Sequence, residues 1–135
     1  MREIRRITAE SGVETEIFVH GALCRCYSGQ CYLSAVIGRR SGNRGLCAQP
    51  CRLPYRYDGK GAERYPLSLK DLSLAHHIPE ICAAGISSLK IEGRMKRPEY
   101  AAVVTAVYAA LLREQRGPTP AEEDALRRVF SRDGF

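Results

Sequence analysis

Residues 15–52 read TEIFVHGALCRCYSGQCYLSAVIGRRSGNRGLCAQPCR and contain five of the six cysteines of the chain. The same stretch holds Glu16 and His20, five glycines and five arginines. Clustered cysteines in a chain without a secretory signal bind metal or carry out chemistry more often than they form disulfides. The best explanation of this stretch is therefore a metal ion or an iron–sulfur centre.

Four of these cysteines form the natural ligand set: Cys24, Cys31, Cys47 and Cys51. Four thiolates saturate either a tetrahedral zinc ion or an iron–sulfur cubane. The spacing has neither the paired C-x-x-C of zinc ribbons nor a common ferredoxin run, so it does not select the metal. The alternative is a set of free thiols packed as small core residues. Cys26 is expected to project elsewhere, and Cys82 is expected to lie in the core.

The composition is that of a small, basic globular protein. The chain has 135 residues, a net charge of +6 and a pI near 9.2. The charge favours an anionic partner, with RNA as the natural candidate, and a mildly basic protein without such a partner is the alternative. No apolar run reaches the roughly 18 residues of a transmembrane helix, and the N-terminus lacks the apolar core of a signal peptide. We therefore expect a cytoplasmic protein.

Hydrophobic periodicity and turn residues predict a mixed α/β fold. Buried strands are predicted at residues 15–20, ended by Gly21, and at residues 87–92. Helices are predicted at residues 2–10, 29–38 (carrying Cys31), 68–72, 79–84, 98–116 and 119–130. Asp58-Gly59 predicts a small β-hairpin at residues 53–66. Because two strands do not complete a parallel sheet, we expect a fragment of a larger α/β protein, or a chain completed by association.

The clearest helical pattern lies in residues 98–116. Its apolar side chains recur at helical spacing and define one face: Tyr100, Val103, Val104, Val107, Tyr108 and Leu111. Gly117-Pro118 ends this helix. Thr119 and Glu122 then form a capping box, with proline at the first position of the next helix.

Two polar side chains belong to the first predicted strand. His20 lies at its end, and Glu16 lies four residues earlier, so we expect both on one face of the strand. A histidine here can donate a proton, bind a ligand, or only orient the loop by a hydrogen bond. A carboxylate in a buried strand needs a partner or a chemical role. Both are candidate catalytic residues.

A second polar group closes the second predicted strand. Ligands of parallel α/β proteins bind beyond the C-terminal strand ends, which makes Lys90 and Glu92 candidate catalytic residues and Arg94 a candidate substrate contact. A structural ion pair between Lys90 and Glu92 is the alternative. Further candidates for substrate binding lie in the basic loop: Arg39, Asn43, Arg44 and Arg52. Arginines grip phosphates well, although surface arginines are usually only solvated.

Several motifs resemble peptidase family U32, the collagenase-like family. The first are ExFxHGALC at residues 16–24 and YSGQCYLS at residues 27–34. The likeness continues in RSGNRGLCAQPCR (40–52), LSLKDL (67–72) and AGISSLKIEGRMKRPEYAAVVTAVY (84–108). FSRDGF at residues 130–135 is similar to the FxRGF segment of that family.

The resemblance implies a TIM-barrel-like (β/α) domain, of which this chain matches only the later part. The expected organisation is a single partial domain over residues 1–135, with a cysteine-rich region (15–52), the hairpin insertion (53–66), a helix–strand–helix segment (67–116) and a C-terminal helix (119–135). The resemblance also implies that the four cysteines of the ligand set hold a 4Fe-4S cluster, with zinc as the alternative. Cys26 falls on a position that is not cysteine in the usual pattern.

The functions that the resemblance implies are divided. The family name comes from collagenase activity, whereas better-understood relatives support hydroxylation of a tRNA wobble uridine, of ribosomal RNA cytidine, or of a quinone precursor. Hydroxylation of RNA fits the residues better, because a four-thiolate centre suits redox chemistry and no nucleophile or activated water for proteolysis is evident. A collagenase-like protease and a zinc-stabilised module that binds RNA or protein are the alternatives. We expect self-association or a partner to supply the missing barrel half, and no complete active site in this chain alone.

Overall fold

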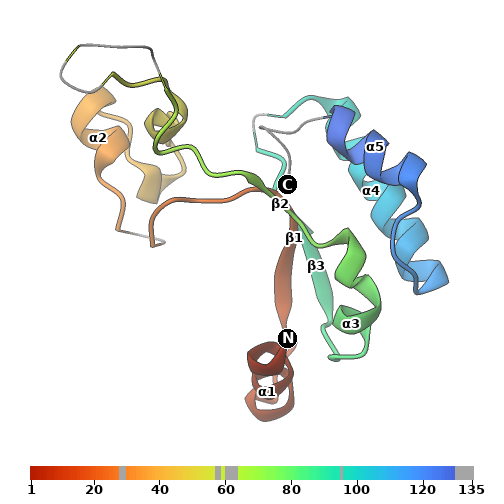
Figure 1. Ribbon diagram of the computed structural model, residues 1–135. Helices are drawn as coiled ribbons and strands as arrows, with labels where there is room; N and C mark the ends of the chain where they lie inside the picture. The colour runs from red at the N-terminus through yellow and green to blue at the C-terminus, as the bar shows by residue number, and fades with distance from the viewer. Residues whose placement is uncertain (28–29, 57–58, 60–63, 95, 130–135) are drawn as a thin grey trace. The chain divides into compact units, whose positions relative to one another are not determined.

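The computed structural model describes residues 1–27, 30–56, 59, 64–94 and 96–129, and divides into two compact units (Figure 1). Unit 1 comprises residues 1–22 and 70–135, and unit 2 comprises residues 23–69. Within the described residues, no helix is both long enough and apolar enough to cross a membrane.

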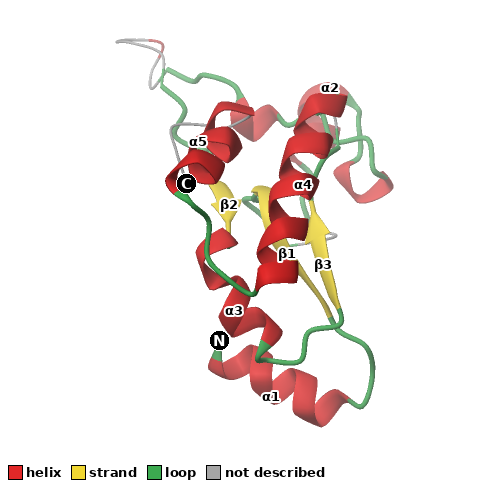
Figure 2. Ribbon diagram, turned by 90° about the vertical axis from the view of Figure 1, so that its right-hand side faces the viewer, coloured by secondary structure: helices red, strands yellow, loops and turns green. Residues whose placement is uncertain are grey.

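Unit 1 is a three-stranded sheet with helices. Along the chain it contains α1 (Arg2–Ser11), β1 (Glu16–Ala22), β2 (Asp71–Ser73), the 3₁₀ helix η4 (Ala75–His77), α3 (Ile78–Cys82), β3 (Ser88–Ile91), α4 (Pro98–Glu114) and α5 (Pro120–Val129). The strand order is β2-β1-β3, with β1 antiparallel to β2 and parallel to β3. Figure 2 shows β1 and β3 side by side, with α4 in front of the sheet. The predicted mixed α/β class is confirmed.

The core of unit 1 lies between the sheet and α4. The apolar face predicted for this helix is buried at five of its six positions: Tyr100, Val104, Val107, Tyr108 and Leu111. These side chains pack with Val19 of β1, with Ile78 and Ile81 of α3, and with Leu126 of α5. Each such side chain contributes about 1.5–3 kcal/mol by leaving water. The core therefore fixes β1 and β3, whose ends carry the candidate site.

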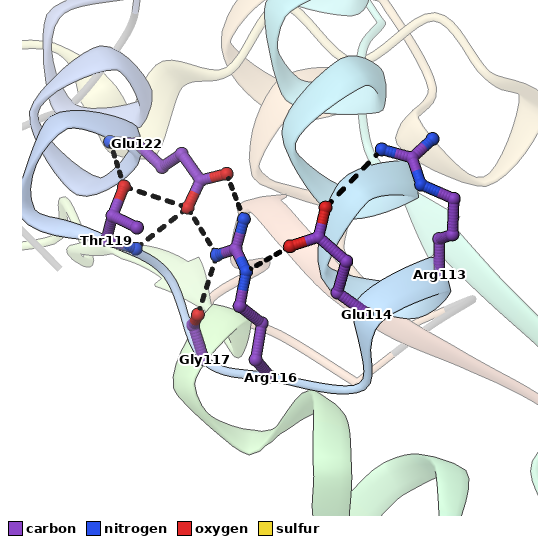
Figure 3. A network of polar contacts seen from close by, with 6 residues as sticks. All are labelled: Arg113, Glu114, Arg116, Gly117, Thr119 and Glu122. Atoms are coloured by element: carbon purple, nitrogen blue, oxygen red, sulfur yellow. Dashed lines mark hydrogen bonds and ion pairs between the residues drawn. The ribbon is translucent and has the colours of Figure 1, made fainter.

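The connection from α4 to α5 contains the predicted capping box. Glu122 N–H donates to Thr119 Oγ1 (3.3 Å), and Thr119 N–H donates to Glu122 Oε2 (2.8 Å). Arg116 also donates to both carboxylate oxygens of Glu122, at 2.6 and 2.9 Å, and to Glu114 at 2.6 Å (Figure 3). These bonds satisfy free N–H groups at the start of α5 and bring Leu126 onto the core.

Replacing Thr119 with alanine is expected to fray the first turn of α5. The change removes the side-chain oxygen that accepts from Glu122 N–H, and loss of such a cap costs about 1 kcal/mol. Amide exchange at residues 121–123 should rise roughly fivefold, while exchange in the middle of α4 stays unchanged. Thr119→Ser keeps the hydroxyl and is the control. Equal protection in the alanine and serine variants would contradict the role of the cap.

Unit 2 is short helices joined by hydrogen-bonded turns. It contains α2 (Leu33–Gly38) and the 3₁₀ helices η1 (Gly42–Arg44) and η2 (Pro50–Arg52). An antiparallel bridge joins Tyr55 and Arg64 where the hairpin was predicted, and residues 57–58 and 60–63 of that hairpin lie outside the described residues. Of the described residues of unit 2, only Ser34 and Pro50 are buried. No hydrophobic core of its own is seen in the part of unit 2 that the structure describes.

Three local predictions were wrong. Strand β1 does not end at Gly21, because it pairs with β2 through Ala22. Residues 71–73 form strand β2 and not the predicted helix, since pairing with residues 20–22 outweighs the helical pattern. Cys31 does not lie on a helix, because α2 begins at Leu33.

Candidate functional site

A buried group of one histidine and two tyrosines lies at the end of β1. His20 is 1% exposed, and its Nδ1 lies 3.3 Å from the hydroxyl of Tyr108. That hydroxyl donates to Val19 O (2.8 Å) and accepts from Leu74 N–H (3.2 Å). The tautomer of His20 that donates from Nδ1 suits this arrangement, since the hydroxyl proton of Tyr108 is directed to Val19 O. The ring of Tyr100 lies 6.0 Å from the imidazole, centroid to centroid.

Burial keeps this group uncharged near neutral pH. Desolvation lowers the pKa of His20 to about 4, with nearby Lys96 lowering it further and Asp71 raising it. Burial raises the pKa of the Tyr100 and Tyr108 hydroxyls to about 12. A general base works best with a pKa near the working pH, so this imidazole is a poor one. It is suited to hold or orient a group by a hydrogen bond.

Asp71 is the residue of this group that sequence analysis missed. Its side chain is 4% exposed, and in the β1–β2 pairing it stands opposite Ala22. Tyr100 and Tyr108 were expected only as core residues. The signal that was available is the aspartate inside the LSLKDL motif, because buried carboxylates are rare unless they are paired or functional. Helical periodicity alone gave no sign that the tyrosine hydroxyls reach the strand ends.

Glu16 and His20 do not share a face of β1. The pairing of β1 with β3 is irregular between Phe18 and His20, and this bulge reverses the alternation of side chains. Glu16 is half-exposed and takes bonds from Lys90 (3.3 Å) and from Ser88 (3.0 Å). The partner expected for this carboxylate is therefore present, on the face that is opposite to the buried imidazole.

The predicted pairing of Lys90 with Glu92 was wrong, because Lys90 pairs with Glu16 on the neighbouring strand. Lys90 Nζ also stands 5.2 Å above the ring of Phe18. Glu92 Oε1 accepts instead from the backbone N–H of Arg94 (3.1 Å), in the turn after β3. The Glu16–Lys90 pair is half-exposed on the sheet, where it can meet a polar ligand.

The four cysteines of the predicted ligand set all lie in unit 2. Burial raises the pKa of the Cys51 thiol, and the neighbouring thiols Cys47, Cys24 and Cys31 raise it further, against the lowering effect of Arg52. Cys47 Sγ accepts from Gln49 N–H (3.3 Å). The thiols are free, and in the described residues no three Cys, His, Asp or Glu side chains are arranged as metal ligands. In type and number these four donors suit a four-thiolate centre.

Cys26 lies closer to this set than sequence analysis expected. Burial raises the pKa of its thiol, and a hydrogen bond with Cys31 and the charges of Cys31 and Cys24 raise it as well. A spacing of two residues separates side chains only in a regular strand, whereas residues 23–27 follow β1 as a loop. Cys82 lies in unit 1 and packs against the core, as predicted.

The predicted arginines differ in their surroundings. Arg52 donates to Leu69 O (2.8 Å), to Ser68 Oγ (3.4 Å) and to Leu23 O, so it braces the first and last residues of unit 2. Exposed positions are occupied by Arg39, Asn43, Arg44 and Arg94. The structure thus leaves Arg39, Asn43 and Arg44 accessible in unit 2, while the guanidinium of Arg52 is held by the fold.

Stability is expected to fall as the pH falls from about 6.5 to about 4, because of His20. The unfolded chain binds a proton at this residue below its usual pKa of 6.5, whereas the folded protein does so only near pH 4, so the contribution is present above pH 6.5 and lost below it. The loss amounts to about 2–3 kcal/mol. Urea unfolding of wild type and His20→Gln at several pH values measures it. The variant should lose this part of the slope, whereas a similar change at exposed His76 should not. An unchanged slope in His20→Gln would contradict the assignment.

Comparisons with known proteins point to one family. The model of peptidase family U32 matches residues 1–135. The chain is 42% identical over 121 residues to the tRNA hydroxylation protein P1 of Bacillus subtilis (strain 168), which covers 82% of this chain and 29% of that protein. It is 43% identical over 123 residues to the 23S rRNA 5-hydroxycytidine C2501 synthase of Escherichia coli (strain K12). This match covers 85% of this chain and 19% of that protein.

A collagenase of Porphyromonas gingivalis is also similar, at 39% identity over 137 residues, which covers 91% of this chain and 38% of that protein. The chain therefore spans between a fifth and two fifths of the length of these relatives. No solved structure matches it.

Proposed function

This chain belongs to peptidase family U32, and on that premise we propose that it takes part in the hydroxylation of RNA as an iron–sulfur protein. The proposal rests mainly on the thiols and the positive charge that unit 2 combines. Residues 23–69 hold the four neighbouring thiols, and they also hold eight arginine and lysine residues against two acidic ones. The rest of the chain has thirteen residues of each sign, so unit 2 carries the whole net charge of +6.

The proposed centre is a 4Fe-4S cluster held by Cys24, Cys31, Cys47 and Cys51. Such a cluster supplies one-electron redox chemistry when it is bound. Two features of unit 2 support this centre. The thiols of Cys24, Cys31 and Cys47 raise the pKa of the Cys51 thiol. Among the described residues of unit 2, only Ser34 and Pro50 are buried. A small unit without a core needs a cross-link or a metal to hold its fold. A zinc ion in the same site is the alternative.

The proposed substrate is RNA, as the names of two relatives suggest. The basic surface of unit 2 would hold the phosphates through Arg39, Arg44 and Asn43. The neutral imidazole of His20 would hold or orient a group by a hydrogen bond at the end of β1. The Glu16–Lys90 pair would meet a polar group of the substrate.

We further propose that unit 1 supplies part of a TIM-barrel-like domain. Strands β1 and β3 are parallel and adjacent, which is the arrangement that such a barrel repeats. His20 and Glu92 stand at the C-terminal ends of these strands, where barrel enzymes carry their sites. The missing strands would come from a longer chain or from a partner. An RNA-modifying protein of this kind would act in the cytoplasm.

Peptide hydrolysis is the second candidate, because a relative is named collagenase. It is less well supported by the described residues. The pKa of His20 is lowered to about 4, so its imidazole is a poor general base for a nucleophile near neutral pH.

Deletion of the gene tests the proposal. Mass spectrometry of nucleosides from tRNA and rRNA should show the loss of one hydroxylated uridine or cytidine, restored by the wild-type gene and not by a Cys47→Ser/Cys51→Ser variant. Iron and sulfide analysis of protein purified without oxygen should give about four of each per chain. Unchanged nucleosides together with cleavage of gelatin would overturn the proposal in favour of peptide hydrolysis.

A further inference from the structure

We infer that the exposed face of α2 and the loop that follows it bind unpaired bases of a single-stranded RNA. The inference rests on the proposed function and names the surface that would take the substrate. We call this face the α2 surface and define it by its exposed residues: Tyr32, Val36, Ile37, Arg39, Asn43 and Arg44. All of them lie within unit 2.

The apolar part of the α2 surface consists of the solvent-exposed side chains of Tyr32, Val36 and Ile37. Tyr32 is 67% exposed, Val36 80% and Ile37 60%. Val36 N–H donates to Tyr32 O (2.8 Å), and residues four apart at the start of a helix lie on the same face. Apolar groups gathered at the surface mark a place of interaction. A flat apolar partner, such as a nucleic acid base, fits this face.

Two exposed arginines follow this apolar face along the chain. Arg39 ends α2 and Arg44 lies in η1, and neither makes an ion pair with a carboxylate among the described residues. Unit 2 as a whole carries the net charge of +6. A partner that offers flat apolar groups and negative charge together is a single-stranded nucleic acid, because its bases stack and its phosphates pair with arginine.

The loop that carries Asn43 and Arg44 is held in its shape by its own hydrogen bonds. Ser41 O accepts from Arg44 N–H (3.2 Å) and from Leu46 N–H (3.0 Å). Arg40 Nε donates to Leu46 O (3.1 Å). Because the loop is already closed, less conformational freedom is lost when a ligand binds. Arg40 therefore supports the loop, and Arg44 and Asn43 remain accessible.

The apolar face requires unpaired bases. In a duplex the bases stack on one another, so the flat faces that a tyrosine ring would cover are not accessible. Proteins that bind single strands combine a basic surface with aromatic stacking. The α2 surface should therefore prefer a loop or a single strand to a helix of the same sequence, whereas its arginines should attract both.

Fluorescence anisotropy of the full chain, purified without oxygen, tests this inference with a labelled uridine-rich RNA of about 12 nucleotides and with the same RNA in a duplex. Tyr32→Ala/Val36→Ser should weaken binding of the single strand about tenfold or more and that of the duplex less than twofold. Arg39→Ala/Arg44→Ala should weaken both, and should reduce the slope of log Kd against log salt for the single strand by about 1.4. Visible absorbance and thermal unfolding of each variant verify the fold.

Matched controls come from unit 1. Val13→Ser changes a valine that is 69% exposed, and Arg127→Ala/Arg128→Ala removes two exposed arginines of α5. Both should leave RNA binding unchanged. If wild type binds RNA and Tyr32→Ala/Val36→Ser binds the single strand equally well, the inference is overturned while the proposed function stands, and the α2 surface belongs to a protein partner. If wild type binds no RNA, the proposed function fails, and the inference fails with it.

Discussion

Replacing Cys47 and Cys51 together with serine is expected to unfold unit 2 while unit 1 keeps its structure. The prediction follows from how little of unit 2 is buried: among its described residues only Ser34 and Pro50 are enclosed. In metal-dependent modules the binding free energy of the metal is the folding free energy, about 10–16 kcal/mol for structural zinc. Two lost thiolates remove the centre, and the hydrogen bonds of the turns alone cannot hold the chain.

Hydrogen exchange resolved by peptide measures this effect. The amides of Arg44 and Leu46 donate to Ser41 O, that of Gly45 to Gly42 O, and that of Ala48 to Ser34 Oγ. Their exchange should rise about a hundredfold or more in the double variant, which corresponds to a loss of about 3 kcal/mol. Amides of α4 should keep their protection, because the core of unit 1 contains none of these cysteines.

Cys26→Ser is the matched control. Cys26 is a neighbour of Cys31, but it is not one of the four proposed ligands, so its replacement should leave unit 2 protected and the iron content unchanged. Equal protection in wild type and in Cys47→Ser/Cys51→Ser would show that no thiolate centre holds this unit. A loss of protection in Cys26→Ser as large as in the double variant would mean that the ligand set was chosen wrongly.

Sequence was sufficient where a local pattern determines the structure. The apolar spacing of residues 98–116 predicted α4 and its buried face, and Thr119 with Glu122 predicted the start of α5. Strand β3 and helix α3 were likewise confirmed. These features depend on residues within a few positions of one another.

Predictions from the sequence failed where contacts between residues distant along the chain determine the local structure. Residues 71–73 became a strand because residues 20–22 offered an edge to pair with. Simple alternation places Glu16 and His20 on one face of β1, but the bulge between Phe18 and His20 puts them on opposite faces. Glu16 therefore forms an ion pair with Lys90 of the neighbouring strand. The tyrosine hydroxyls around His20 come from a helix about ninety positions away. No local rule predicts contacts of this kind.

Gly21→Ala is expected to be the most destabilising single substitution proposed for unit 1. Gly21 has φ +121°, which side-chain-bearing residues rarely adopt, and a Cβ there would lie 2.5 Å from Glu92 O, 2.9 Å from Glu92 Cβ and 3.1 Å from Tyr100 Oη. The backbone oxygen cannot move away freely, because it accepts from Tyr100 (3.0 Å). This close approach explains the glycine that follows His20 in the HGALC motif.

The expected cost of Gly21→Ala is about 3–5 kcal/mol, as the sum of backbone strain and overpacking. For a unit of this size, that lowers Tm by roughly 15–30 °C, measured by circular dichroism at 222 nm. Gly12→Ala separates the two causes, because Gly12 has φ +64° with nothing within 4 Å of a Cβ, and it should cost only about 1 kcal/mol. Similar losses in the two variants would show that strain alone acts, and that β1 does not meet Glu92 as closely as the structure places it. A much larger loss at Gly21 is the expected result, because only there does the added Cβ meet Glu92 and Tyr100.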